Sequence, residues 1–296
     1  MKIGLLLFEQ FYGKKGLGSS RIRGHWIAKH WKSVLPEVGD IELYKFGMKY
    51  DVLIFQKAYF TEFARNFTGP KILDLCDPDW LIWNSKMVEM IQECDAITCS
   101  SMELTKAVAT FTKKPVFFVP DRVDLTGLPS PKIHVGPTKK VVWYGYSQNF
   151  DMLNSAVKLV ADLKLELVVI SDGVYAPPAS LELNYINYPF SENYLNDIQS
   201  GDVVLNPQWN KGKWKYKSDN KTSIAKAIGM PVAHNGDELK ALLTEEERIK
   251  ASQEGLDFVR KERDVKQSVT DMKEVILEVL KTKGIDPATI GANGKA

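Results

Sequence analysis

Short, continuous apolar segments alternate with amphipathic segments along most of the chain. KIGLLLFE (2–9), YDVLIFQKA (50–58) and PVFFVP (115–120) are examples of the former, and RIRGHWIAKHWKSV (21–34) has the periodicity of a helix. Strands that are apolar along their whole length are typical of a parallel sheet with helices on both faces. The pattern therefore predicts an α/β domain over residues 1–122.

The alternation stops in DRVDLTGLPSPKIHVGPTKK and then begins again. This segment is rich in Pro and Gly and lacks periodicity, which indicates a linker over residues 123–138. KVVWYGY and LELVVISDG, both strand-like, follow it and alternate with helices, so a second α/β domain is predicted over 139–263. The predicted fold class is α/β, with two Rossmann-like domains that face each other across a cleft and bind ligands at the carboxyl ends of their strands.

Two segments close the chain. A loose tail is expected over 282–296, where Gly, Pro and Ala occur without periodicity. A helix is predicted over 264–281, because five apolar side chains recur along one side of it: Val265, Val269, Met272, Ile276 and Val279.

Composition limits the class of protein. A chain of 296 residues, 44% of them hydrophobic and 26% charged, is typical of a soluble two-domain protein, and its net charge of +2 favours no partner. No apolar run approaches the ~18 residues of a membrane span, and MKIGLLLFEQ is interpreted as a buried strand rather than a signal peptide. A cytoplasmic protein is therefore expected. Cys76, Cys94 and Cys99 are too few for a disulfide framework and are predicted to be buried thiols.

The segment KYKSDNKTSIAKAIGMPVAHN (215–235) predicts an anion-binding helix. Ser218, Asp219 and Asn220 are N-cap candidates for a short helix over 221–228 that ends at the Gly-Met-Pro sequence. The N–H groups and partial positive charge of its N-terminus suit a phosphate or diphosphate, whereas a capped helix with solvated lysines is the alternative. The candidate diphosphate-binding residues are Lys217, Ser218, Asn220 and Lys221.

Two further motifs belong to the same predicted donor site. WYGYSQN continues a strand into a glycine turn, where a phosphate can approach the backbone, but it lacks the G-x-G-x-x-G fingerprint of dinucleotide sites. NYPFSENYL places two aromatic rings at a strand end, where they either stack on a nucleobase or pack within the domain. The residues concerned are Gly145, Tyr146, Ser147 and Asn149 in the first motif and Tyr188 and Phe190 in the second.

The glycine-rich sequence EQFYGKKGLGSSRIRGHW follows the first strand. Its glycines, hydroxyl groups and two arginines at the start of a helix predict a second anion site, which we interpret as the acceptor site. The candidate acceptor-binding residues are Gly16, Gly18, Ser19, Arg21 and Arg23.

Candidate catalytic groups lie in the same domain. KILDLCDPDWLIW (71–83) ends a predicted strand with aspartates, and Asp77 is the first candidate for taking a proton from an acceptor hydroxyl or aligning the sugar. Asp79 and His25 are the other two candidates. A turn-starting Asp77 and a surface His25 are the alternatives, and His134, in the linker, is expected to be solvated.

Aromatic residues alternate with lysines in WNKGKWKYKSDNK (209–221). Such a segment can stack on bases and neutralise phosphates. A flexible surface loop beside the donor site has the same composition. A nucleic acid acceptor is therefore one of two interpretations of this segment.

Taken in order, these motifs resemble GT-B-fold glycosyltransferases, particularly the retaining, sugar-nucleotide-dependent group of cell-surface and phage enzymes. The resemblance covers nearly the whole chain. It is carried by the glycine loop, CDAITCSSMELTK with PVFFVPDRVDL, VVWYGYSQN, DVVLNP and, most specifically, KSDNKTSIAKAIGMPVA. It implies transfer of a sugar from a nucleoside diphosphate, such as a UDP-sugar, to a hydroxyl of a modified DNA base or a surface glycan. A phage-infected bacterial cell is included in the expected localisation.

The chain departs from that family at two positions. Many retaining members have two glutamates eight positions apart, where this chain has Tyr216 and Ile224. The sugar and the stereochemistry are therefore open, and a non-catalytic nucleotide-sugar-binding protein and a sugar-nucleotide epimerase are alternative functions. No Asp-x-Asp pair accompanies the donor motifs, so the helix near Lys221, and neither a metal ion nor a cofactor, is expected to stabilise the diphosphate.

Overall fold

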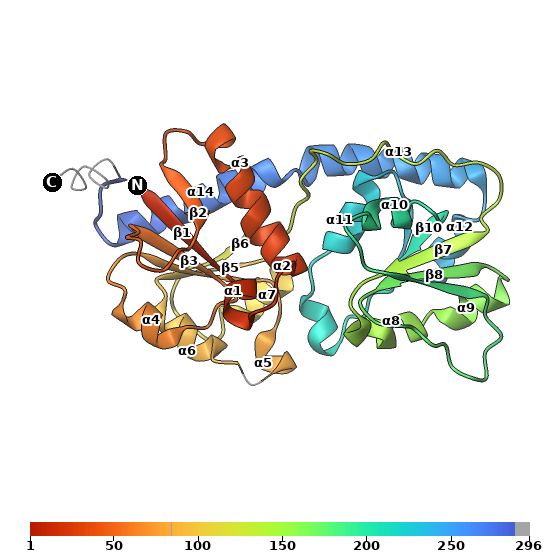
Figure 1. The fold of residues 1–296 in the computed structure, drawn as a ribbon, viewed down its shortest axis with the longest axis horizontal. Helices are drawn as coiled ribbons and strands as arrows, with labels where there is room; N and C mark the ends of the chain where they lie inside the picture. Colours follow the sequence, from red (N-terminus) through yellow and green to blue (C-terminus); the bar gives the residue numbers. More distant parts are fainter. Residues whose placement is uncertain (84, 288–296) are drawn as a thin grey trace. The chain divides into compact units, whose positions relative to one another are not determined.

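The computed structural model describes residues 1–83 and 85–287. They form two units, each built on one parallel sheet (Figure 1). The predicted α/β fold with two Rossmann-like domains is therefore confirmed, whereas most of the predicted loose tail lies outside the described residues. Unit 1 contains residues 1–124, 211–218 and the chain from 264 onward, and unit 2 contains residues 125–210 and 219–263.

Unit 1 is a six-stranded sheet with helices on both faces. Its strands are β1 (Lys2–Leu7), β2 (Asp40–Leu43), β3 (Val52–Gln56), β4 (Lys71–Leu75), β5 (Ala96–Cys99) and β6 (Val116–Phe118). Its helical elements are α1 (Phe8–Tyr12), α2 (Gly18–Ser20), η1 (Arg21–His25), α3 (Trp26–Val34), α4 (Thr61–Asn66), α5 (Asp79–Ile82), α6 (Met87–Glu93), α7 (Met102–Val108), η3 (Gly212–Tyr216) and α14 (Val265–Thr282).

The strands of unit 1 lie in the order β2-β1-β3-β4-β5-β6, and all their pairings are parallel. The order reverses between β1 and β3. In doubly wound sheets, ligands bind outside the carboxyl ends of the strands at such a switch point, because the connecting loops diverge there. Phe8, after β1, and Lys57, after β3, follow the two strands that meet at this point.

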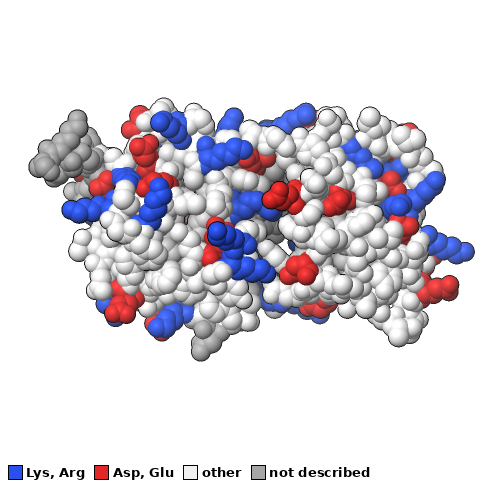
Figure 2. All heavy atoms as spheres, in the orientation of Figure 1, with Lys and Arg blue, Asp and Glu red and all other residues white. Residues whose placement is uncertain are grey.

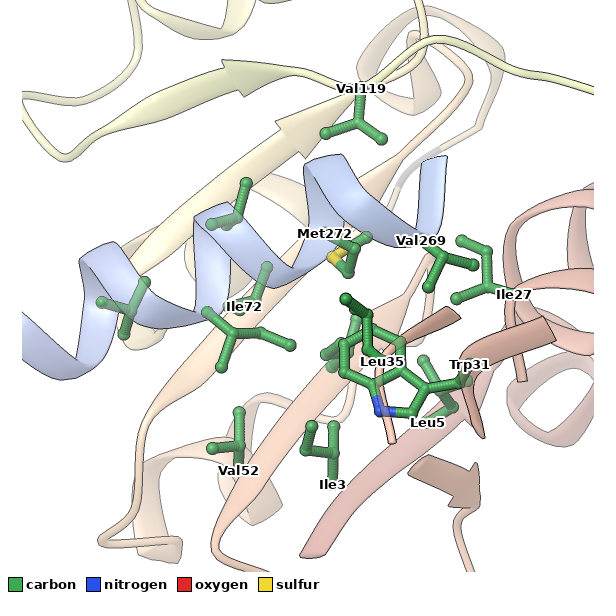
Figure 3. Close-up of a cluster of buried hydrophobic side chains, with 14 of the residues drawn as sticks. Ile3, Leu5, Ile27, Trp31, Leu35, Val52, Ile72, Val119, Val269 and Met272 are labelled. Carbon is green, nitrogen blue, oxygen red and sulfur yellow. The ribbon is translucent and has the colours of Figure 1, made fainter. Parts of the chain in front are cut away.

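Alternate side chains of β1 enter two different cores, because successive residues of a strand point to opposite faces. Leu5 packs with α3 and α14 (Figure 3). Leu6 packs with α4, α6 and α7 on the other face. The closing helix is therefore part of the core of unit 1. All five apolar side chains predicted along it are buried there: Val265, Val269, Met272, Ile276 and Val279.

Unit 2 is a five-stranded parallel sheet in the order β11-β10-β7-β8-β9, so its switch point lies between β7 and β10. Helices α8 and α9 cover one face, and α10, α11 and α13 cover the other (Figure 1). The strands are β7 (Lys140–Tyr144), β8 (Glu166–Ser171), β9 (Tyr185–Pro189), β10 (Val203–Leu205) and β11 (Val232–Ala233). The helical elements are η2 (Ser147–Asn149), α8 (Phe150–Asn154), α9 (Val157–Asp162), α10 (Tyr194–Ile198), α11 (Asn220–Ala227), α12 (Gly236–Ala241) and α13 (Glu245–Glu262).

The segment predicted as a linker is folded onto unit 2 over its second half. Residues 123–138, all of which are described, contain no helix or strand apart from an isolated bridge at Val123. The expectation of a solvated His134 is wrong: its ring is buried and its Nε2 lies 2.9 Å from the carbonyl oxygen of Gly229. Burial lowers the pKa of His134. Gly229 has the left-handed backbone predicted for the end of the α11 helix, with φ of 74°.

Cys76, Cys94 and Cys99 are buried thiols, as predicted, and burial raises the pKa of each. Within the described residues, no helix combines the length and the apolar composition needed to cross a bilayer. Figure 2 shows both signs of charge spread over the face in view.

Candidate functional site

Gly145 and Lys221 of unit 2 lie together at the switch point between β7 and β10. The Lys221 ammonium group is 4.8 Å from the centre of the Trp143 ring, and a Cβ atom at position 145 would overlap that ammonium group. Gly145 also has φ of 155°, which a side chain would strain. The absence of a side chain at position 145 therefore lets Lys221 approach the end of β7.

Helix α11 begins beside this glycine turn. It spans eight residues from Asn220 to Ala227, one residue earlier than predicted. The carboxylate of its N-cap residue, Asp219, accepts a hydrogen bond from Arg263 at 3.0 Å. The first turn of α11 therefore brings the positive end of a helix dipole to the switch point, next to Lys221.

A chain of hydrogen bonds that the sequence analysis missed supports this first turn. Asn206 Nδ2 donates to Thr222 Oγ1 at 3.1 Å, and Thr222 Oγ1 lies 2.9 Å from His234 Nε2. His234 Nδ1 lies 2.8 Å from a carboxylate oxygen of Glu238. Burial alone would raise the pKa of Glu238, but hydrogen bonds from the His234 backbone and ring outweigh it and lower that pKa. The chain ties α11 to the ends of β10 and β11.

The other donor-binding candidates of unit 2 are more dispersed. The Ser147 N–H donates to the Asp172 carboxylate at 2.8 Å, which holds the η2 turn against the loop after β8. Tyr146 and Asn149 lie in or beside the same turn. The aromatic pair lies elsewhere, at the end of edge strand β9: Tyr188 and Phe190 are exposed, and the Phe190 ring stacks on Tyr194 at 4.8 Å. Their contact with a nucleobase stays a prediction.

Lys217 and Ser218 directly precede the N-cap of α11 in the chain and have partners in unit 1, while their predicted role in donor binding stays a prediction. Both belong to unit 1, in which the Lys217 ammonium group forms an ion pair with Asp77. Ser218 Oγ donates to the Asp121 carboxylate at 2.5 Å. In the same segment, the carbonyl oxygen of Tyr216 accepts a hydrogen bond from Ser101. Residues 211–218 are therefore bound to unit 1 by charged and polar contacts.

Arg23 is a buried structural cation, which contradicts its predicted contact with an acceptor. It lies in η1, a short π-helix, and donates to both carboxylate oxygens of Asp74, to Asp121 and to the Val119 carbonyl. Arg21 diverges from it and lies 5.8 Å from the Trp26 ring. Burial raises the pKa of Asp121 although Arg23 and Ser218 oppose the shift.

Asp77 is enclosed by two ammonium groups. Lys57 contacts Asp77 at 2.5 Å and Asp79 at 3.2 Å, and Lys217 pairs with Asp77 from the other side. Burial alone would raise the pKa of Asp77, but Lys217 and Lys57 hold it well below its ordinary value. Because such a carboxylate is already paired, it is a weak proton acceptor.

Asp79 and Lys57 belong to the same cluster of unit 1. Asp79 is buried and accepts a hydrogen bond from the Tyr59 hydroxyl. Burial and then the neighbouring Asp77 raise the pKa of Asp79, against the effect of Lys57. Lys57 has a left-handed backbone, with φ of 52°, a strained conformation that is frequent at functional sites. Within the described residues, no group of three or more His, Cys, Asp or Glu side chains could hold a metal ion.

His25 has a carboxylate partner that the sequence analysis missed. His25 Nε2 lies 2.7 Å from Glu9 Oε1, and the other oxygen of Glu9 accepts the Gly16 N–H at 3.1 Å. The Glu9 N–H in turn donates to Ser20. Glu9 is the second residue after β1, so the pair lies at the switch point of unit 1, where the His25 ring remains half exposed. A histidine held by a carboxylate is a suitable proton acceptor.

The remaining acceptor-binding candidates are the loop residues Gly16, Gly18 and Ser19, and their contact with an acceptor stays a prediction. The Gly16 N–H is used by Glu9, and Gly18 and Ser19 form the start of the helical run α2–η1–α3. Gln56, at the end of β3, accepts hydrogen bonds from the Phe8 N–H and the Ser20 hydroxyl. The glycine loop is thus tied to both strands of the switch point.

No protein-family model matches the chain, and no curated protein sequence matches it. Solved structures share its fold. HepE from Anabaena, solved with UDP and glucose, has a TM-score of 0.68 at 13% identity, over 94% of this chain and 100% of HepE. An alpha-glucosyltransferase solved with UDP-glucose and DNA containing an abasic site has a TM-score of 0.60 at 11% identity, over 94% of this chain and 99% of that protein.

TarM from S. aureus is similar over a smaller part. Its TM-score is 0.59 at 10% identity, over 75% of this chain and 54% of TarM, so this chain matches about half the length of TarM. At such identities the comparison concerns the fold alone. The GT-B fold implied by the sequence motifs is confirmed.

Proposed function

We propose that the protein is a glycosyltransferase that moves a sugar from a nucleoside diphosphate to an acceptor hydroxyl. The observation that carries this proposal is the convergence of Gly145, the α11 N-terminus and Lys221 at the switch point of unit 2. A glycine turn admits a phosphate close to the backbone, and the helix end and the lysine supply positive charge. HepE and the alpha-glucosyltransferase, solved with UDP and UDP-glucose, support a UDP-type donor.

The same convergence suits the leaving group. As the bond between the sugar and the diphosphate breaks, negative charge accumulates on the departing phosphate oxygen. The α11 dipole and the Lys221 ammonium group are fixed near one another and would stabilise that charge without a metal ion. The relay through Thr222 and His234 holds the first turn of α11 in place.

His25 is the best-supported group for activating the acceptor. In the tautomer that suits an ionised Glu9, 2.7 Å away, His25 Nε2–H is the donor, and Nδ1 is then left to accept a proton from the acceptor hydroxyl. Asp77 is less suitable, because Lys57 and Lys217 hold its pKa low. We therefore assign Asp77 a structural role in unit 1 and keep acceptor activation for the His25–Glu9 pair.

Donor binding is tested by the stabilisation that a ligand confers. UDP at a hundred times its dissociation constant should add about 2.7 kcal/mol to the free energy of unfolding. Lys221→Ala should weaken UDP binding at least about ten-fold, because it removes a charge-assisted contact worth about 1.5–3 kcal/mol. Lys158→Ala, on the exposed side of α9, is the matched control and should bind UDP as the wild type does. A wild type that no nucleoside diphosphate stabilises contradicts the proposed donor site.

Catalysis is tested by UDP release from UDP-sugars in water, which substitutes for the acceptor. His25→Ala should slow release by about 10²-fold or more with little change in UDP affinity. The replacement of the family's two glutamates by Tyr216 and Ile224 favours the alternative of a binding protein, which would hold the sugar nucleotide and release no UDP. An epimerase would return an isomerised sugar nucleotide instead, which chromatography of the products separates from both.

A further inference from the structure

Unit 1 exposes a group of large apolar side chains on two short helices. Tyr12 of α1 is 62% exposed, and Leu81, Ile82 and Trp83, at and after the end of α5, are 51%, 38% and 37% exposed. A ring contact joins α1 to the end of α5, because the Phe8 ring, which stacks on Tyr12 of its own helix at 5.2 Å, lies 6.5 Å from the ring of Trp83 between ring centres. We name this group the α1–α5 patch. Single exposed apolar residues are ordinary, whereas a contiguous group marks an interaction site.

The inward faces of the same helices are already occupied. Phe11 of α1 packs edge-on against Tyr59 and Phe60, and Trp80 of α5 packs against Phe111. The patch therefore consists of the residues left over after these helices have buried one side. Nothing in unit 1 covers the outward side within the described residues.

Lysines flank the patch on both sides. Lys14 and Lys15 follow Tyr12 in an exposed turn between two left-handed glycines, and the second of these, Gly16, is held by its hydrogen bond to Glu9. Lys86 is exposed three residues after Trp83. Among the described residues, no carboxylate pairs with any of the three lysines.

We propose that the α1–α5 patch docks on the surface of a membrane that carries anionic lipid. Leucine and isoleucine insert among acyl chains, tryptophan and tyrosine favour the interface, and lysines bind anionic headgroups. Nucleic acid suits the patch less, because Leu81 and Ile82 have no ring face on which a base can stack. The net charges of the two units are consistent with docking through unit 1. Unit 1 contains 26 Lys and Arg against 20 Asp and Glu, whereas unit 2 contains 13 Lys and Arg against 17 Asp and Glu.

The patch adjoins the switch point of unit 1. The Phe8 ring lies 4.5 Å from the Lys57 ammonium group, which pairs with Asp77, and Phe8 directly precedes Glu9. Membrane docking would therefore bring the His25–Glu9 pair near the lipid headgroups. If the proposed transferase function holds, on which this step rests, the acceptor is a hydroxyl carried by a lipid at the membrane surface.

Docking is tested by co-sedimentation of the full chain with vesicles, in the absence of any nucleotide. The wild type should sediment with mixed phosphatidylcholine–phosphatidylglycerol vesicles and much less with pure phosphatidylcholine. Leu81→Ser should weaken this binding at least about ten-fold. Lys14→Gln combined with Lys15→Gln should weaken it by about 25-fold on mixed vesicles, about five-fold for each lysine, and leave binding to pure phosphatidylcholine unchanged.

Matched controls lie in unit 2. Ile133→Ser removes an apolar side chain that is 84% exposed, and Lys240→Gln combined with Lys250→Gln removes two exposed lysines; both should bind vesicles as the wild type does. Equal melting temperatures show that each variant is folded. The proposal is overturned if the wild type binds neither vesicle, if the patch variants bind as well as the wild type, or if only an oligonucleotide is bound. Vesicle binding without any UDP binding would refute the transferase and keep the docking surface.

Discussion

Each unit buries one arginine, but the two arginines are neutralised in different ways. Arg23 of unit 1 is surrounded by the carboxylates of Asp74 and Asp121. Arg248 of unit 2 donates instead to neutral oxygens, those of Thr138, Gly136 and Leu243. The first arrangement is a buried ion network, and the second is a cation solvated by backbone and hydroxyl groups.

The difference extends to the ends of the two sheets. In unit 1, carboxylates and ammonium groups around Asp77 and Asp121 already satisfy one another, so little charge remains for a ligand. In unit 2, the corresponding region is built from Gly145, the helix α11 and Lys221 beside Trp143, with a hydrogen-bond relay through Asn206, Thr222 and His234 behind them. Opposite charges that are paired within the fold stabilise it, whereas a helix dipole and a lysine over an aromatic ring are suited to an added anion.

The largest expected effect comes from breaking the ion network of unit 1. Arg23→Met leaves two buried carboxylates without a cation, which should cost about 3–5 kcal/mol of stability at neutral pH. Peptide-resolved hydrogen exchange and urea unfolding would measure the loss and locate it in unit 1. Arg65→Met, which removes an exposed arginine paired with Glu93, is the control and should leave stability nearly unchanged.

The pH dependence of the stability lost in Arg23→Met tests whether unpaired carboxylates cause the loss. Without Arg23, the folded-state pKa of Asp121, which burial already raises, should rise further, because the cation that opposes the shift is removed. A carboxyl group with a raised folded-state pKa favours the fold below its unfolded pKa and loses that contribution as the pH rises through the folded value. The deficit of the variant should therefore shrink in acid. A deficit that is constant with pH contradicts the ion-network interpretation.

Arg248→Met should have a smaller effect, about 1–3 kcal/mol, because it leaves carbonyl and hydroxyl oxygens unsatisfied and no buried carboxylate. Its deficit should be the same at acidic and at neutral pH. A marked pH dependence like that of the Arg23 variant would remove the distinction between the two units. The measurement is urea unfolding at a series of pH values.

Asp77→Asn should change how the free energy of unfolding falls at acidic pH. The folded-state pKa of Asp77 is lowered by Lys217 and Lys57, so its contribution is present above the ordinary aspartate pKa of about 3.9 and is lost as the pH falls through the folded value. We expect the variant to lose about 1 kcal/mol at neutral pH and to unfold less steeply in acid. The pKa of Asp79 is raised, so its effect on the pH dependence of stability has the opposite sign. If Asp77→Asn leaves the loss of stability in acid unchanged, other groups cause that loss.

The smallest effect is expected in the hydrogen-bond relay of unit 2 that includes Thr222 and His234. Thr222→Val keeps the shape of the side chain but removes the hydrogen bonds to Asn206 and His234, at a cost of about 0.5–1 kcal/mol. Because these bonds hold the first turn of α11, UDP binding should weaken several-fold in a calorimetric titration. Thr110→Val, at an exposed position of unit 1, should change neither quantity. Unchanged UDP affinity in Thr222→Val would show that α11 needs no such support.

The two domains and most of their elements follow from the sequence. Apolar periodicity is a local property, set by the geometry of helices and strands. It predicted both sheets and the closing helix, whose Val269 and Met272 side chains are buried in the core of unit 1. The glycine at position 145 and the short helix before Gly229 were predicted from equally local backbone rules. These predictions needed no knowledge of which segments meet.

Only the tertiary structure decided which polar groups pair. The sequence does not show whether a lysine or an arginine is solvated, bound to a ligand or buried, because the residue that pairs with it is distant in the chain. Arg23 meets Asp74 and Asp121, which follow it by 51 and 98 residues in the chain, and Lys217 forms an ion pair with Asp77, which lies 140 residues away in the chain. His25 gained its partner, Glu9, in the same way, since the loop after β1 folds back on the helical run that follows it. Charge pairing depends on long-range contacts, and those are created by the packing of the apolar segments that the sequence does reveal.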